Sequence, residues 1–253
     1  MKKLNSLTAV ACLSLIGATA NATIISFDGA TKNGGAAETG IASGVGTGIN
    51  GTEPYGETLS FTDFTVTAGQ STNTNLANEN SFNRTAKIAA RRVYQDWRHA
   101  GLGVVTFNSL SHDGIESNVG NNAKKDEVLF FDFGMEALLE TVFFNGGHSE
   151  ITTSDDDTNY SDGKDALFNI FVSNDGDAYT GIMGGQQQPT LRDYLNTGLT
   201  GAYQYYAVAS TGWGAHSSYV EAIEYTKVPE PGTLALLVLG LAGVGFARRQ
   251  RKA

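Results

Sequence analysis

Apolar and polar residues alternate along parts of the chain with the two-residue period of a β-strand. The clearest case is 218–226, Ser-Tyr-Val-Glu-Ala-Ile-Glu-Tyr-Thr. Successive residues of a strand point to opposite faces of the sheet, so this run predicts a strand with one buried face. More continuous apolar runs predict strands that are buried on both faces. These runs are 128–133, 138–144, 166–173 and 203–210.

Gly, Asn and Asp residues separate the predicted strands, and these residue types favour tight turns. The tripeptide at 134–136 lies between 128–133 and 138–144, which predicts that these two strands pair as a hairpin. The apolar positions of 58–68 change phase after Phe61, which predicts a bulge inside one strand. Many short strands joined by turns predict an all-β fold, specifically an antiparallel β-sandwich of jelly-roll-like form.

One segment, 86–97, is ambiguous. Its apolar residues Ile88, Val93 and Trp97 fit helical spacing, and its alanines favour a helix. The same residues also fit an irregular strand, so the pattern leaves both possibilities open.

Residues 1–22 have the three parts of a secretory signal peptide. Two lysines open the segment, a long apolar run follows, and Ala20 and Ala22 form the small-residue site that signal peptidase recognises. The mature protein is therefore predicted to begin at Thr23. The single cysteine, Cys12, is lost with the signal peptide, which excludes disulfides and thiol chemistry.

The C-terminal segment 228–253 also has three parts in a fixed order. It contains Pro229-Glu230-Pro231, a mostly apolar stretch predicted to form a transmembrane helix over 233–247, and a basic tail with Arg248, Arg249, Arg251 and Lys252. Such a helix is about 22 Å long, whereas the hydrocarbon core of a bilayer is about 30 Å thick. It can span only with local thinning or with snorkelling of the basic side chains. The positive-inside rule places the basic end in the cytoplasm.

This combination of motif, helix and basic tail resembles the PEP-CTERM sorting signal of exosortase-dependent surface proteins. The resemblance implies a Gram-negative source and recognition of Pro229, Glu230 and Pro231 by exosortase, a membrane protease-transpeptidase. It implies a protein that is exported, anchored transiently in the inner membrane, and then sorted to the cell surface or the extracellular space. The predicted organisation is a signal peptide at 1–22, an ectodomain at 23–227 and a sorting signal at 228–253.

Charge narrows the choice of partners. Six of the 17 Lys and Arg residues and one of the 26 acidic residues lie in the two terminal segments, which leaves 11 against 25 in residues 23–228, a net charge of −14. This charge repels nucleic acid and anionic lipid headgroups. It is compatible with divalent cations and with neutral glycans.

An acidic loop is the clearest candidate for a metal site. Asp155, Asp157, Asn159 and Asp162 present oxygen ligands that suit Ca²⁺, although Tyr160 stands where an EF-hand needs glycine. The alternative interpretation is a solvated acidic loop without a metal.

A second candidate, Glu116, Asn118, Asp126 and Glu127, lies where a polar loop meets a predicted core strand. Here the alternative is a loop of turn-forming residues that Lys124 and Lys125 partly neutralise.

No catalytic motif is visible. The four histidines lack zinc-site spacing, and the chain has no G-x-S-x-G elbow and no P-loop. We therefore expect no enzymatic activity and no obligatory cofactor. We expect a structural or interaction role at the cell surface, linked to exopolysaccharide or biofilm. The alternative is a carbohydrate-binding β-sandwich module, calcium-dependent or not, for which Trp213 between two glycines is the candidate platform for a sugar ring.

If the acidic loop binds calcium, Ca²⁺ will raise the melting temperature. A ligand that binds only the native state stabilises it by about 2.7 kcal/mol at 100 times its dissociation constant, and this corresponds to several degrees for a domain of this size. Calorimetry should compare CaCl₂ with NaCl at matched ionic strength, because general screening of acidic repulsion also stabilises. Equal shifts in both salts, or a calcium shift that survives Asp155→Ala with Asp157→Ala, would exclude this loop.

Overall fold

The computed structural model describes residues 21–27, 38–39, 46–47, 54–72, 76, 79–96, 101–105, 115–118, 125–145, 167–187, 194–210, 214–228 and 240. Residues 22–228 form one compact unit, and residues 1–21 and 229–253 form a second. Of the second unit, only Asn21 and Gly240 are described. The transmembrane helix predicted over 233–247 thus lies outside the described residues except for Gly240. Within the described part of the chain, no helix is long and apolar enough to cross a membrane.

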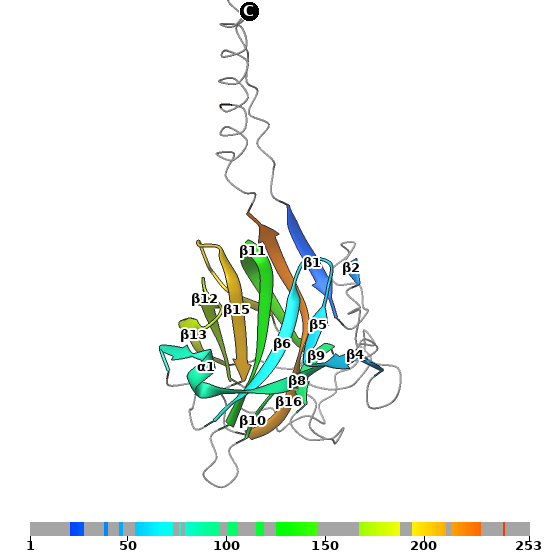
Figure 1. Cartoon of the computed structure of the whole chain (residues 1–253), viewed down its shortest axis with the longest axis vertical. Coiled ribbons are helices and arrows are strands. Elements are labelled where there is room, and N and C mark those ends of the chain that lie inside the picture. The colour runs from blue at the N-terminus through cyan, green and yellow to red at the C-terminus, as the bar shows by residue number, and fades with distance from the viewer. Residues whose placement is uncertain are drawn as a thin grey trace, which may run out of the picture. The chain divides into compact units, whose positions relative to one another are not determined.

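The compact unit is built almost entirely from strands (Figure 1). They are β1 (Ala22–Ser26), β2 (Glu38–Thr39), β3 (Gly46–Thr47), β4 (Pro54–Gly56), β5 (Thr58–Ser60), β6 (Thr65–Ser71), β7 (Ser81–Asn83), β8 (Ile88–Asp96), β9 (Gly101–Val105), β10 (Ile115–Asn118), β11 (Lys125–Asn145), β12 (Leu167–Ser173), β13 (Ala178–Gln187), β14 (Tyr194–Asn196), β15 (Tyr203–Ser210) and β16 (Gly214–Lys227). One short helix, α1 (Arg84–Lys87), precedes β8. The expected all-β class is confirmed for the described residues.

The strands belong to one hydrogen-bonded network, whose main order is β2-β1-β16-β9-β8-β6-β11-β15-β12-β13-β7. Among the described residues, the ladders are antiparallel, except that β1 and β2 run parallel. β11 also pairs with β16, so β16, β9, β8, β6 and β11 close a ring. Closure of this kind leaves these strands without a free edge.

The long strand β11 corrects one prediction. The two apolar runs at 128–133 and 138–144 do not pair with each other as a hairpin. They form the two halves of one strand that bends at Gly134, whose φ is +66°. The first half lies between β6 and β15, and the second half lies between β16 and β14. The connection at 134–136 therefore redirects the strand rather than reversing it.

The phase change in 58–68 has a different cause from the predicted bulge. β5 and β6 form a tight antiparallel hairpin, and the amide of Phe61 donates to the carbonyl of Phe64 across its turn (2.9 Å). Two polar residues, Thr62 and Asp63, lie within that turn. The apolar phase shifts because the chain reverses direction.

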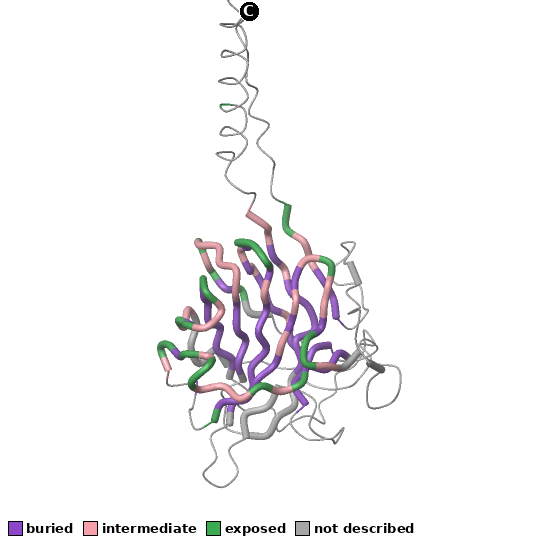
Figure 2. The backbone as a smooth tube through the Cα atoms, viewed as in Figure 1, coloured by how far each residue is buried: buried purple, intermediate pink, exposed green. Residues whose placement is uncertain are grey.

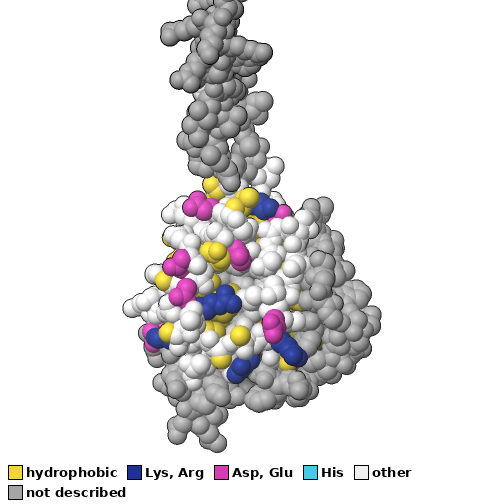
Figure 3. All heavy atoms as spheres, viewed as in Figure 1, with side chains coloured by type: hydrophobic (Ala, Val, Ile, Leu, Met, Phe, Trp, Pro, Cys, Tyr) yellow, Lys and Arg dark blue, Asp and Glu magenta, His cyan; other side chains and the backbone are white. Residues whose placement is uncertain are grey.

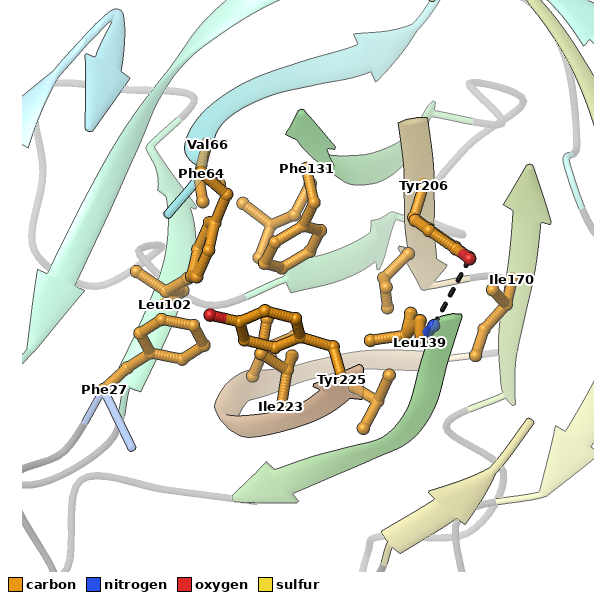
Figure 4. Close-up of a cluster of buried hydrophobic side chains, with 14 of the residues drawn as sticks. Phe27, Phe64, Val66, Leu102, Phe131, Leu139, Ile170, Tyr206, Ile223 and Tyr225 are labelled. Atoms are coloured by element: carbon orange, nitrogen blue, oxygen red, sulfur yellow. Dashed lines mark hydrogen bonds between the residues drawn. The ribbon is translucent and has the colours of Figure 1, made fainter. Parts of the chain in front are cut away.

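The main hydrophobic core lies between two layers of sheet that β11 connects. One layer contributes Val66, Phe131, Ile170 and Tyr206, and the other contributes Ile25, Leu139, Ile223 and Tyr225. In Figure 4, Phe131 and Tyr206 point toward Leu139 and Tyr225 across the core. Figure 2 shows buried residues along the middle of the strands and exposed residues at the turns. This is the face-to-face packing of a β-sandwich.

The hydroxyl of Tyr206 connects the layers at the bend of β11. It donates to the carbonyl of Ala137 (2.6 Å) and accepts from the amides of Leu139 (3.3 Å) and Tyr203 (3.2 Å). The ladder between β11 and β15 shifts register between Asp132 and Ala137, which interrupts the regular strand pairing. Burial raises the pKa of Tyr206, so this hydroxyl stays protonated and available as a donor.

A second apolar cluster lies on the opposite face of the layer formed by β6, β11, β15 and β12. Val128, Phe130, Phe171 and Ala207 point outward there, and Leu76, Phe82 and Tyr179 cover them. Leu76 is fixed by two side chains, because its amide donates to the carboxylate of Asp126 (2.5 Å) and its carbonyl accepts from the side chain of Asn169 (2.9 Å). The layer is therefore apolar on both faces near its centre.

The ambiguous segment 86–97 is mainly a strand. Its first two residues end α1, and Ile88–Asp96 form β8, which pairs with β6 and β9. The helix is capped by Asn83, whose side chain accepts from the amide of Ala86 (2.9 Å). Pairing with two neighbours outweighs the weak helical preference of the alanines.

Two buried tyrosines provide a matched test of the bend. Tyr206→Phe should lower the free energy of unfolding by about 2–4 kcal/mol, because it leaves buried backbone groups of β11 without a partner. Tyr179 is equally buried, but its hydroxyl makes no hydrogen bond to the described residues. Tyr179→Phe should therefore leave stability unchanged or raise it. Urea unfolding measures both, and equal losses would contradict the role given to Tyr206.

Candidate functional site

Most residues that the sequence analysis selected lie outside the described part of the chain. These are Ala20, Asp155, Asp157, Asn159, Asp162, Trp213, Pro229, Glu230, Pro231, Arg248, Arg249, Arg251 and Lys252. The geometry of the calcium loop, of the sugar platform and of the sorting motif is therefore not described, and these sites remain predictions from the sequence. Ala22 is described, and it is the exposed first residue of β1.

In the second candidate metal site, Asp126 and Glu127 are part of the buried structure of the fold. Asp126 and Glu127 are buried at the start of β11 rather than exposed in a loop. Asp126 accepts the amide of Leu76 and receives support from Ser71, whose hydroxyl oxygen accepts the amide of Asp126 (2.8 Å). Among the described residues, no group of three or more His, Cys, Asp or Glu side chains could hold a metal ion.

The site that the structure does describe is the end of β16, where the compact unit leads into residues 229–253. β16 lies between β1 on one side and the second half of β11 on the other. Its residues Ala222, Ile223 and Tyr225 are completely buried. The strand that carries the sorting segment is thus an interior strand rather than an edge strand.

Polar contacts hold the last residues of this strand. The ammonium of Lys227 donates to Oδ1 of Asp63 (2.5 Å), and the hydroxyl of Tyr225 donates to Oδ2 of the same carboxylate (2.8 Å). The amide of Val228 donates to the carbonyl of Glu136 at the bend of β11 (3.1 Å). Hydrogen bonds to the rest of the compact unit therefore continue to Val228, the residue before Pro229.

The pKa of Asp63 reflects these contacts. Partial burial acts to raise the pKa, but the hydrogen bonds from Lys227 and Tyr225 and the charge of Lys227 outweigh it. The pKa of Asp63 consequently lies below its ordinary value of 3.8.

Both ends of the compact unit emerge from adjacent strands. In the antiparallel ladder of β1 and β16, Ala22 lies opposite Thr226, and Thr23 lies opposite Tyr225. Thr226 is itself fixed by a hydrogen bond from its hydroxyl to Glu140 (2.5 Å). Ala22, the residue before the predicted cleavage, and the end of β16 therefore lie next to each other at one end of the unit.

Comparison with known families identifies the sorting segment. Residues 227–252 match the family described as the PEP-CTERM protein-sorting motif. The chain thus carries this motif at its C terminus, starting from the last residue of β16. The motif implies processing by exosortase, and it implies an exported protein that is sorted to the cell surface.

Comparison with solved structures gave distant likenesses. CpGH89CBM32-6 produced by Clostridium perfringens matches with 12% identity and a TM-score of 0.30, over 40% of this chain and 69% of that one. CpGH89CBM32-5 from Clostridium perfringens, in complex with GalNAc-beta-1,3-galactose, matches with 13% identity and a TM-score of 0.28, over 39% of this chain and 65% of that one. The search of curated proteins found no match.

The sequence pattern identified the C-terminal segment but not the residues that hold the end of β16. Asp63 and Lys227 are 164 positions apart, and Asp63 lies in a turn that was interpreted as part of a strand. No local pattern connects them. The one available signal was the polar pair Thr62 and Asp63 between two apolar stretches, which is typical of a hairpin turn.

Asp63→Asn should remove contacts that hold the C-terminal end of β16, and it should change how the free energy of unfolding depends on pH. The loss should be about 1 kcal/mol near neutral pH, because the Lys227 side chain is 37% exposed and water screens the ion pair. A carboxylate whose pKa is lowered by folding stabilises above its unfolded pKa and loses that contribution as pH falls through the folded pKa. The difference from wild type should therefore shrink below about pH 4. Urea unfolding from pH 7 to pH 2.5 measures it, and a difference independent of pH would argue against the carboxylate.

Proposed function

We propose that the chain is a structural or interaction protein of the cell surface or extracellular matrix, linked to exopolysaccharide or biofilm. In this proposal signal peptidase cuts after Ala22, the C-terminal helix holds the protein in the inner membrane, and exosortase then sorts it. The observation that carries the proposal is the sorting motif that begins at the last residue of an interior strand. We propose no enzymatic activity and no binding to nucleic acid.

The organisation that we propose is a signal peptide at 1–22, an ectodomain at 23–227 and a sorting signal at 228–253. The compact unit at 22–228 supports it. We further propose a jelly-roll-like connectivity within the β-sandwich, which the antiparallel ladders support. The net charge of −14 in residues 23–228 supports a partner that is not polyanionic.

The sorting route can be tested with a motif variant. Pro229, Glu230 and Pro231 changed to alanine should leave the protein in the inner membrane of a host that has exosortase, because the recognised peptide is gone while the membrane helix remains. Fractionation and immunoblotting measure the distribution. Gly232→Ala with Thr233→Ala is the matched control, since it alters the same segment outside the motif. Normal surface levels of the motif variant would contradict the proposal.

The carbohydrate-binding alternative requires a described surface that suits a sugar. Trp213 lies outside the described residues, so it supplies no geometry. We propose a different surface, over β6, β11 and β15, as the place where a sugar would bind.

A further inference from the structure

A row of polar side chains crosses the outer face of the layer formed by β6, β11, β15 and β12. In the ladders, Asp132 lies opposite both Thr65 and Tyr205, and Tyr205 lies opposite Ser173. We call these four residues the polar row. The next row toward the covered cluster contains Thr67, Phe130, Ala207 and Phe171. The polar row thus begins where the apolar cover of this face ends.

The central side chains of the row are held by hydrogen bonds. Oδ1 of Asp132 accepts from the amide of Gly134 (2.8 Å) and from the side-chain amide of Gln204 (3.1 Å). The same nitrogen of Gln204 donates to the hydroxyl of Tyr205 (2.8 Å). Because the Tyr205 oxygen accepts here, its proton is available for another acceptor. Oδ2 of Asp132 makes no hydrogen bond within the described residues.

The ring of Tyr205 is also fixed in position. A Cβ atom on Gly176 would lie only 3.1 Å from its Cε1 atom, so the turn backbone packs directly against the ring. Tyr205 is nevertheless half-buried rather than buried, which leaves part of the ring accessible. A rigid, partly exposed aromatic ring offers contact area at little entropic cost.

A basic group and a second tyrosine border the row. The guanidinium of Arg84 lies 4.1 Å from the centre of the Phe130 ring and donates to the hydroxyl of Thr67 (2.8 Å). The Tyr179 side chain is 1% exposed, and its hydroxyl has no hydrogen-bond partner among the described residues. Burial is the main cause that raises the pKa of this hydroxyl. The charge of Asp132 acts in the same direction, and the charge of Arg84 acts to lower the pKa. The buried hydroxyl of Tyr179 thus lies near the charges of Arg84 and Asp132 at the border of the row.

We propose that this surface binds a neutral saccharide, with Asp132 accepting sugar hydroxyls, Tyr205 contributing its ring and its hydroxyl proton, and Arg84 donating at the border. A carboxylate, a guanidinium and an amide beside an aromatic ring provide the few convergent polar groups and the apolar contact that small-ligand sites combine. Asp132 and Arg84 cancel in charge, and Asp175 and Asp177 lie on the adjoining turn. The local field therefore disfavours an anionic ligand.

The face that carries the row displays a mixed surface. Figure 3 shows hydrophobic, basic and acidic side chains interspersed over β6, β11 and β15, without a broad patch of one kind. Such a surface is unsuited to a lipid bilayer or to a polyanion, and it agrees with a polar, uncharged ligand. This inference goes beyond the sorting role, because it assigns a ligand to the ectodomain and can fail without affecting the sorting proposal.

A structural function for the same residues is the competing explanation, since they also hold the turn at 174–177 against the sheet. Two conservative substitutions separate the explanations. Tyr205→Phe keeps the ring and removes one hydroxyl, and Asp132→Asn keeps the shape and removes the charge. Tyr203→Phe is the matched control, because Tyr203 is a half-buried tyrosine of the same strand whose ring packs on the main core instead.

The full-length protein should be solubilised in an amine-oxide detergent, since sugar-based detergents would compete. Affinity electrophoresis through gels containing dextran, β-glucan or galactomannan then measures binding, and alginate serves as the anionic polysaccharide. We expect retardation by at least one neutral polymer and not by alginate. Tyr205→Phe should weaken binding about five-fold and Asp132→Asn about ten-fold or more. Tyr203→Phe should bind as wild type, and melting temperatures should confirm that each variant is folded.

The proposal is overturned if no neutral polymer retards the wild type, or if only alginate does. It is also overturned if folded Tyr205→Phe binds as tightly as wild type, or if Tyr203→Phe loses as much affinity. If Asp132→Asn fails to fold, the comparison of the two tyrosine variants decides alone.

Discussion

The fold depends on one strand that serves both layers of the sandwich. β11 leaves the first layer at Gly134 and enters the second by Ala137, and a strand that changes layers must break its ladder at the bend. Buried backbone groups without partners would cost several kcal/mol there. The hydroxyl of Tyr206 bonds three of them, one carbonyl and two amides. The bend places the two halves of β11 in different layers, and the hydrogen bonds of a single side chain, Tyr206, stabilise it.

The covered outer face follows from the same strand. The first half of β11 is apolar on both faces because Leu129 and Phe131 point into the main core while Val128 and Phe130 point outward. Aromatic residues that point outward must be shielded from water. Leu76 and Phe82, which lie between β6 and β8 in the chain, cover them together with Tyr179. Asp126 and Asn169 fix that cover at Leu76 through its backbone. Polar side chains face solvent on this face of the layer beyond the residues that Leu76, Phe82 and Tyr179 cover, which is where the polar row begins.

Periodicity predicted the strands where one segment pairs along its whole length, as in β12, β15 and β16. It failed where geometry depends on distant partners. The pattern of 128–144 predicts a hairpin because a glycine lies between two apolar stretches. Instead, Glu136 bonds Val228 and Ala137 lies opposite Lys227 at the end of β16, about ninety positions away. The tail was predictable because its motif, helix and charges are contiguous. The contacts of Asp63 and the row around Asp132 and Tyr205 were not, since they form only when separate strands align.

The separation of β1 and β16 along the chain has a kinetic consequence for their pairing. β1 is made first, but its long ladder is with β16, which is completed about two hundred residues later. Loop closure over such a separation is slow and cannot precede synthesis of the second strand. The sandwich therefore cannot close around an incomplete chain. A finished core therefore requires a chain that has been made at least as far as Lys227, and a chain cut short within β16 cannot complete the pairing that holds β1.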